Sequence, residues 1–334
     1  MGANSRYLNF YQGTPVLVTG GSGAIGSNLC RALAGLGATV VALDDLSSSD
    51  RSSVADLPNC VLVEGGVTDQ AALDQVFGFK PRVVFHLAAL FANQNSVDHP
   101  ERDLLVNGLG TLKVLQSARL AGADRVVYAS SSSLVGATTA QMPITEEALS
   151  TELHTPYQIT KLLGELYANY FKNYYKYQTV RVRFFNSYGP GELPGPYRNV
   201  IPNFVYTAMQ RQPLCITGNG DETRDWTYVG DIVDGLLRAA VFDTAVGELF
   251  NLASSTETRV RDLALWINEI TGNDAGIVHT ARRDWDTHSR RWASIAKAKR
   301  LLGYEPQTDL YAGLQKTVTW FRENWPDIQS RVRG

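Results

Sequence analysis

The sequence has few cysteines, and none of them stands in a pairing pattern. Its three cysteines, Cys30, Cys60 and Cys215, lie far apart among apolar neighbours, and no CxxC pair occurs. An odd and scattered set of cysteines predicts neither a disulfide framework nor a zinc site. We therefore expect three small buried side chains, a reducing compartment and no bound metal.

The chain also lacks a strong charge and a long apolar run. Its formal net charge is -2, which excludes the broad basic surface that attracts nucleic acid or anionic membranes. No apolar run approaches the roughly 18 residues needed to cross a bilayer. The first residues, MGANSRYLNFYQG, lack a basic segment followed by an apolar stretch. We expect no secretory signal, no membrane partner, no nucleic-acid partner and a cytoplasmic protein.

The composition is that of an ordinary globular protein, with 44% hydrophobic and 19% charged residues in 334. The first half alternates apolar runs with amphipathic stretches. The runs rich in Val, Leu and Ala are 14–20, 38–45, 60–66, 82–89, 124–132 and 180–186. Buried strands separated by helices predict an α/β fold with a Rossmann-type doubly wound parallel sheet and a smaller C-terminal α/β lobe. Ligands of such sheets bind at the carboxyl ends of the strands.

A glycine-rich turn, TGGSGAIG, lies directly between the first apolar run and an expected helix at about 24–36. Gly20 permits a tight turn, Gly23 lets the backbone approach a diphosphate, and Gly26 lets the helix pack closely on the strand. The helix N-terminus, with Ala24 and Ile25, presents free N–H groups to the phosphates. The turn therefore predicts a dinucleotide site.

The second apolar run ends in a carboxylate, Asp44. A carboxylate at this distance from the glycine turn accepts hydrogen bonds from the adenosine ribose hydroxyls. It also repels a 2′-phosphate, and no arginine follows until Arg51, so NAD is favoured over NADP. Asp45 and Leu46 are counted with it as cofactor-binding residues.

A candidate catalytic set follows further along. Ser131 lies at the end of an apolar run, and Tyr157 and Lys161 have the YxxxK spacing that places them one helical turn apart on one face. A lysine ammonium and a charged nicotinamide would lower the tyrosine pKa by about 1–3 units. The phenolate would then take a proton from a hydroxyl while hydride leaves for NAD. Ser131 would hydrogen-bond the same oxygen.

These motifs occur together with several others: HLAA, NGLGT, SSS, YQITK, RFFNSYGPG and RDWTYVGDIVDG. The combination spans nearly the whole chain and resembles the extended short-chain dehydrogenase/reductase family, in particular its nucleotide-sugar epimerases and dehydratases of the UDP-glucose 4-epimerase type. The resemblance implies an enzyme that binds NAD and a nucleotide-diphosphate sugar and that forms a homodimer.

The resemblance also implies roles for individual residues. Further cofactor contacts would be Val67, Leu87, Ala88, Ala89 and Asn107, of which Asn107 also supports the sheet and the active site. Substrate contacts would be Phe91, Ser96, Ser132 and Ser133 near the sugar, Asn186, Arg224 and Arg283 at the diphosphate, and Asn199 and Val200 at the base. One position departs from the family pattern, because Gly66 stands where relatives carry an aspartate that bonds the adenine.

The resemblance divides the chain into two lobes. An NAD-binding Rossmann domain would comprise 1–185 together with about 226–253. The nucleotide-sugar-binding domain would comprise 186–225 and 254–334. The Gly- and Pro-rich segment 187–199 is expected to be a loop between them.

The residues after Ser131 bear on which reaction follows the oxidation. A 4,6-dehydratase of this family would carry an Asp-Glu pair where this chain has Ser132 and Ser133, and a uronate decarboxylase would keep a Glu at the second position. The serines favour epimerisation at the sugar C4. A dehydratase or UDP-glucuronate decarboxylase stays open as the alternative. A non-catalytic NAD sensor is disfavoured because Tyr157 and Lys161 are both present. The sugar and the nucleotide base stay undetermined.

A helix expected at about 156–177 carries a dense aromatic face. Its members are Tyr167, Tyr170, Phe171, Tyr174 and Tyr175. Our preferred interpretation is that this face packs into the core, and half of a dimer interface is the alternative.

Overall fold

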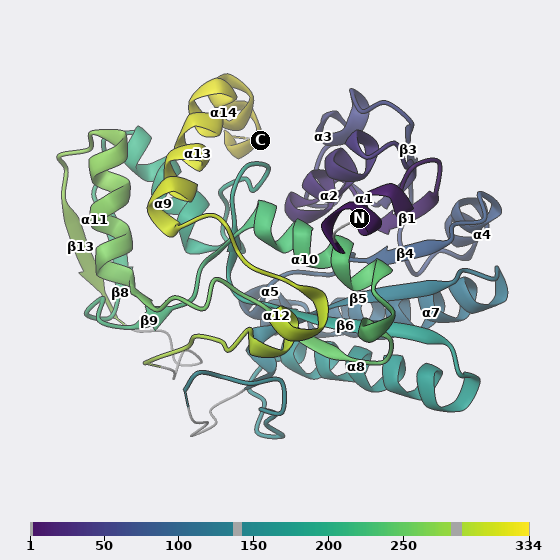
Figure 1. The fold of residues 1–334 in the computed structure, drawn as a ribbon. Coiled ribbons are helices and arrows are strands. Elements are labelled where there is room, and N and C mark those ends of the chain that lie inside the picture. Colours follow the sequence, from purple (N-terminus) through teal and green to yellow (C-terminus); the bar gives the residue numbers. More distant parts are fainter. Residues whose placement is uncertain (1–2, 136–141, 282–288, 334) are drawn as a thin grey trace.

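The computed structural model describes residues 3–135, 142–281 and 289–333. Its centre is a parallel seven-stranded sheet in the order β11-β6-β5-β4-β1-β2-β3 (Figure 1). The strands are β1 (Pro15–Thr19), β2 (Thr39–Asp44), β3 (Cys60–Glu64), β4 (Val83–His86), β5 (Arg125–Ser131), β6 (Gln178–Phe184) and β11 (Leu249–Leu252). All six strands expected from the apolar runs are present, and the doubly wound fold is confirmed.

Two hydrophobic layers cover the sheet because successive side chains of a strand point to opposite faces. Val16 and Val18 of β1 pack into one layer, and Leu17 packs into the other. The first layer is completed by α1 (Ala3–Phe10), α2 (Ala24–Gly35), α10 (Val229–Val241) and α12 (Ala296–Leu302). The second is completed by α4 (Gln70–Gly78), α7 (Gly110–Leu120) and α8 (Pro156–Tyr175). Burial on both faces explains the continuous apolar runs.

A third hydrophobic cluster lies apart from the sheet, among elements from the second half of the chain (Figure 1). Its elements are α9 (Val200–Met209), β8 (Leu214–Thr217), α11 (Val260–Thr271), β13 (Ile277–Thr280), α13 (Leu310–Glu323) and α14 (Trp325–Arg333). Two further short pairs join β7 (Ser187–Tyr188) to β10 (Thr227–Tyr228) and β9 (Thr223–Arg224) to β12 (Thr258–Arg259). The segment 187–199 is therefore a loop only after Tyr188.

The chain reverses its direction across the sheet between β1 and β4. From β1 it adds β2 and β3 on one side, and from β4 it adds β5 and β6 on the other. The connections at such a switch point diverge and leave a crevice at the carboxyl ends of the strands. Two short helices follow strands at this edge: α3 (Ser52–Ala55) follows β2, and α5 (Asn93–Asp98) follows β4. After α5, the chain continues through α6 (Pro100–Asp103) and the π-helical turn η1 (Leu104–Leu109) into α7.

Two expectations about apolar side chains are corrected. Of the cysteines, Cys30 is buried, Cys60 is half-buried and Cys215 is exposed, because Cys215 points to the face of β8 opposite the buried Leu214 and Ile216. On α8, Phe171 packs into the core, but Tyr170, Tyr174 and Tyr175 are exposed. The aromatic face is therefore mainly a surface feature.

Within the described ranges, no helix is long and apolar enough to span a bilayer.

Candidate active site

A cavity of about 590 Å³ opens at the switch point, between the carboxyl ends of the strands and the elements of the third cluster. One wall comes from the glycine turn, the ends of β2, β4 and β5, and the start of α8. The opposite wall comes from the loop after β7, the start of α9 and strand β8. The cavity therefore brings together residues that the sequence predicts to bind the cofactor and residues that it predicts to act on the substrate.

The glycine turn has the geometry of a phosphate-binding cradle. Gly20 has φ +71°, and a Cβ on it would lie 2.8 Å from the Ala88 nitrogen. A Cβ on Gly26 would lie 1.9 Å from the Gly20 carbonyl oxygen, so only glycine permits this approach of α2 to the turn. Gly23, Ala24, Ile25 and Gly26 all line the cavity, and no side chain caps the helix at Gly23. The N-terminus of α2 is thus open toward the cavity.

Asp44 lies at the end of β2 and holds the surrounding loops. Its carboxylate accepts hydrogen bonds from the Ser22 nitrogen at 3.0 Å, the Leu46 nitrogen at 2.9 Å and the Ser49 hydroxyl at 2.8 Å. Asp44 and Asp45 line the cavity, together with Val67, Leu87, Ala88 and Ala89. Leu46 is not among the lining residues, so its connection to the site runs through its N–H bond to Asp44.

Ser131, Tyr157 and Lys161 converge on the cavity from two adjacent elements. Ser131 ends β5, and its Oγ lies 2.9 Å from the Ser133 Oγ. Tyr157 and Lys161 lie in the first two turns of α8, which begins there because Thr155 and Gln158 form a capping box and Pro156 occupies the first turn. The Lys161 Nζ donates to the Ala129 carbonyl at 2.8 Å and lies 5.6 Å from the centre of the Tyr157 ring.

Two residues expected at the site lie behind it instead. Ser96 is fully buried and does not line the cavity, contrary to the expected contact with the sugar. Its hydroxyl donates to the Asn93 carbonyl and accepts from the Tyr157 nitrogen at 3.0 Å, so it anchors the start of α8. Asn107 is also buried outside the lining, and its amide bonds both the nitrogen and the oxygen of Leu90. Its supporting role fits the geometry, whereas direct cofactor contact does not.

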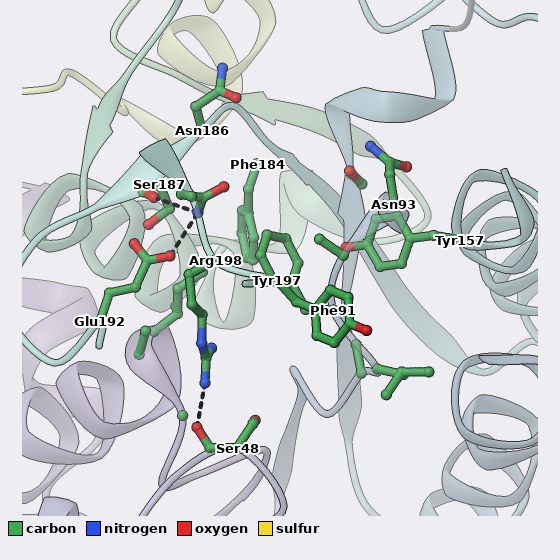
Figure 2. Close-up of a pocket in the computed structure, with 18 of the residues that line it drawn as sticks. Ser48, Phe91, Asn93, Tyr157, Phe184, Asn186, Ser187, Glu192, Tyr197 and Arg198 are labelled. Atoms are coloured by element: carbon green, nitrogen blue, oxygen red, sulfur yellow. Dashed lines mark hydrogen bonds between the residues drawn. The ribbon is translucent and has the colours of Figure 1, made fainter. Parts of the chain in front are cut away.

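The residues expected to bind substrate line the rest of the cavity. They are Phe91, Ser132, Ser133, Asn186, Asn199, Val200 and Arg224. Phe91 meets the Tyr157 ring edge-on at 6.0 Å between centroids, and Figure 2 shows the two side by side. Asn186 is held by a 2.8 Å bond from its amide to the Asp225 carbonyl. Arg283 lies outside the described residues.

The comparisons agree with this geometry. The model of the NAD dependent epimerase/dehydratase family matches residues 16–253. A UDP-glucose 4-epimerase of Mycolicibacterium smegmatis is 35% identical over 310 residues, which cover 92% of this chain and 98% of the relative. A UDP-N-acetyl-alpha-D-glucosaminuronate decarboxylase of Bacillus cytotoxicus is 30% identical over 316 residues, which cover 92% of this chain and 97% of the relative.

A solved structure of an epimerase from Methanothermobacter thermautotrophicus superposes with a TM-score of 0.96 at 54% identity, covering 98% of this chain and 97% of the other. The chain belongs to the NAD dependent epimerase/dehydratase family. NAD is its cofactor. The open helix N-terminus, the glycine cradle and Asp44 fit that cofactor.

Burial shifts the ionisation of Tyr157 and Lys161. Burial raises the pKa of the Tyr157 phenol; hydrogen bonding with Ser131 lowers it, and the charge of Asp103 raises it. Burial lowers the pKa of Lys161 to about 8, and Asp103 opposes that change. Burial therefore dominates at Tyr157, and the pKa of its phenol is raised and not lowered as expected.

The loop after β7 supplies site residues that the sequence patterns did not identify. Glu192 is buried in the cavity wall, where it accepts a 2.9 Å bond from Asn199, and burial raises its pKa to about 7. Arg198 donates to the Ser48 carbonyl (Figure 2). The Tyr197 hydroxyl donates to Asp98 at 3.0 Å. The only sequence signal was charge inside a Gly- and Pro-rich loop, which solvent exposure explains equally well.

Proposed function

We propose that this protein is an NAD-dependent nucleotide-sugar 4-epimerase. The observation that carries the proposal is that the lining of the cavity has serines, Ser131, Ser132 and Ser133, at the end of β5. Serines can orient a hydroxyl or a carbonyl but cannot remove a proton from carbon or expel a hydroxyl at neutral pH. The nearest newly found acid, Glu192, lies across the cavity from Tyr157 (Figure 2). This lining supports a reaction that ends when hydride returns to C4.

In the proposed reaction the protein groups handle one proton. Tyr157 accepts the proton of the sugar C4 hydroxyl and later returns it to the same oxygen. Ser131 hydrogen-bonds the same oxygen, and the Lys161 ammonium favours the phenolate. NAD, when bound, would supply the acceptor for the C4 hydride and the source of its return to the opposite face of that carbon. Inversion requires the keto sugar to turn over, and the aromatic surfaces of Phe91 and Tyr197 provide walls without fixed hydrogen bonds to either face.

The remaining contacts are part of the same proposal. Asp44 would bond the adenosine ribose, Asn186 and Arg224 the substrate diphosphate, and Asn199 and Val200 the base. The division into an NAD-binding domain (1–185 and about 226–253) and a sugar-binding domain is supported by the separate third hydrophobic cluster.

The function is tested with a panel of nucleotide sugars. The protein with NAD is incubated with UDP-glucose, UDP-glucuronate, their N-acetyl relatives and dTDP-glucose, and the products are identified by NMR. We expect one of them to give its C4 epimer. A 4-keto-6-deoxy product, or released carbon dioxide, would replace the proposal with the dehydratase or decarboxylase alternative.

We also propose that the exposed apolar face of α8 and η1 forms the interface of a homodimer. On α8 the exposed side chains include Ile159, Leu166, Tyr170 and Tyr174, and on the adjacent η1 they include Leu104 and Leu105. Residues 166, 170 and 174 follow one another at a spacing of four, so they lie along one stripe. A second copy would cover the same face by twofold symmetry. Leu166→Glu should convert a dimer to a monomer in sedimentation equilibrium, and a monomeric parent protein would refute the interface.

A further inference from the structure

A buried carboxylate stands behind the catalytic helix. Asp103 is the last residue of α6 and has no exposed surface. Its Oδ2 accepts a 2.7 Å bond from the Thr160 hydroxyl, and its Oδ1 accepts a 2.6 Å bond from the Asn107 amide. Thr160 lies between Tyr157 and Lys161 on α8. Burial raises the pKa of this carboxyl, while the bonds from Thr160 and Asn107 and the charge of Lys161 each lower it.

The two partners of Asp103 connect it to separate parts of the site. Thr160 belongs to the helix that carries the catalytic pair. Asn107 bonds the backbone nitrogen of Leu90 at 2.8 Å and its carbonyl at 3.2 Å. Leu90 directly precedes Phe91, which lines the cavity against the Tyr157 ring. Asp103 is thus the junction at which α8, η1 and the loop after β4 are joined.

The other groups packed around the catalytic pair carry little free charge. His86 lies between the hydroxyls of Thr19 and Thr111, and burial lowers its pKa to about 3, so it is neutral. Tyr128 is buried with a raised pKa. Glu165, one turn beyond Lys161, is paired through both oxygens with Arg183. Asp103 supplies the carboxylate charge that acts on both Tyr157 and Lys161.

We propose that Asp103 is a positioning residue that controls the ionisation of the Tyr157–Lys161 pair from behind α8, while it joins that helix to the loop carrying Phe91. The proposal rests on the proposed function, in which Tyr157 exchanges the proton. A negative charge favours the ammonium of Lys161 and opposes the phenolate of Tyr157, so it raises both pKa values. Burial already lowers the Lys161 pKa to about 8. Without Asp103 the lysine would lose much of its charge near neutral pH.

The test uses Asp103→Asn, with NAD bound. Titration of Tyr157 is followed by tyrosinate absorbance, as the difference between each protein and the same protein carrying Tyr157→Phe. We expect the Tyr157 pKa to fall by about 0.5–1 unit. In the pH profile of turnover, both the acidic and the alkaline limb should move to lower pH, because both pKa values fall together.

The matched control is Thr160→Val, which removes one bond to Asp103 and keeps the charge. The acidic and alkaline limbs of the pH profile of this variant should stay at the same pH even if kcat falls. The proposal fails if Asp103→Asn leaves the Tyr157 titration unchanged, or if Thr160→Val shifts it equally. Circular dichroism and NAD binding verify folding, and Asp103→Ser is the replacement if the asparagine variant does not fold. Since the absorbance titration requires no substrate, it tests Asp103 even if the sugar panel gives no epimer.

Discussion

The two walls of the cavity are built differently. On the wall formed by β5 and α8, the side chains of Tyr157 and Lys161 are buried, and Lys161 donates a 2.8 Å bond to the Ala129 carbonyl of β5. On the opposite wall, the loop after β7 reaches across the cavity through more exposed contacts, from Arg198 to Ser48 and from Tyr197 to Asp98. The first arrangement suits chemistry that needs preset geometry. The second suits entry, retention and release of ligands.

The largest effect is expected on the buried wall. Tyr157→Phe removes the proton-exchanging hydroxyl and keeps the ring that packs against Phe91. We expect kcat to fall at least about 100-fold, the low end of what general acid-base catalysis supplies, while NAD binding survives. Turnover is measured with the substrate that the panel identifies. Unchanged turnover would show that Tyr157 takes no part in the reaction. The assignment of the chemistry to the wall formed by β5 and α8 would then fail.

A smaller effect is expected where the loop crosses to the cofactor side. Arg198→Ala removes the bond to the Ser48 carbonyl, in the segment that follows Asp44 and Asp45 along the cavity. A partly exposed charged hydrogen bond contributes about 1 kcal/mol, so NAD should dissociate about 5-fold faster. Release is measured by stopped-flow fluorescence without substrate.

Tyr197→Phe is the matched control for Arg198→Ala, because it breaks the contact of the same loop with Asp98 on α5. It should change NAD release less than Arg198→Ala. Equal acceleration by both variants would mean that the loop as a whole, and not Arg198, retains the cofactor.

The smallest effect is expected from the ionisation of Glu192, which should make KM depend on pH. Its pKa is raised to about 7 by burial, so it is neutral below that pH and anionic above it. An anionic Glu192 repels a nucleotide diphosphate, so KM should rise about 3-fold as pH increases through 7. Glu192→Gln imitates the neutral form and should keep KM low across the range. A parallel rise of KM in both proteins would exclude Glu192 as its cause.

The same raised pKa affects stability. The folded protein binds the Glu192 proton more tightly than the unfolded chain, whose carboxyl has the ordinary pKa of 4.5. The stability linked to this group is therefore greatest at low pH and is lost as pH rises through 7.

The glycine turn and the Ser131, Tyr157 and Lys161 set lie together at one cavity, and the sequence indicates them because their signals are local. The glycine turn, the YxxxK spacing and the apolar runs each depend on residues that are neighbours along the chain. The residues it placed wrongly or missed depend on contacts between distant segments. Ser96 was expected at the sugar but bonds the start of α8, 61 residues away. Asp103 and Glu192 carried no local signal, since only the folded chain buries them. The exposed tyrosines of α8 gave a helical period that does not distinguish a core from an uncovered surface.

The central claim is that hydride leaves C4 and returns to the same carbon without passing through solvent. It is tested most directly with the identified nucleotide sugar carrying deuterium at C4, incubated with the protein in ordinary water until the epimers equilibrate. The account predicts that NMR and mass spectrometry find the deuterium fully retained at C4 of both epimers, with no solvent hydrogen at C4 or C5. Loss of deuterium from C4, or entry of solvent hydrogen at carbon, would contradict it.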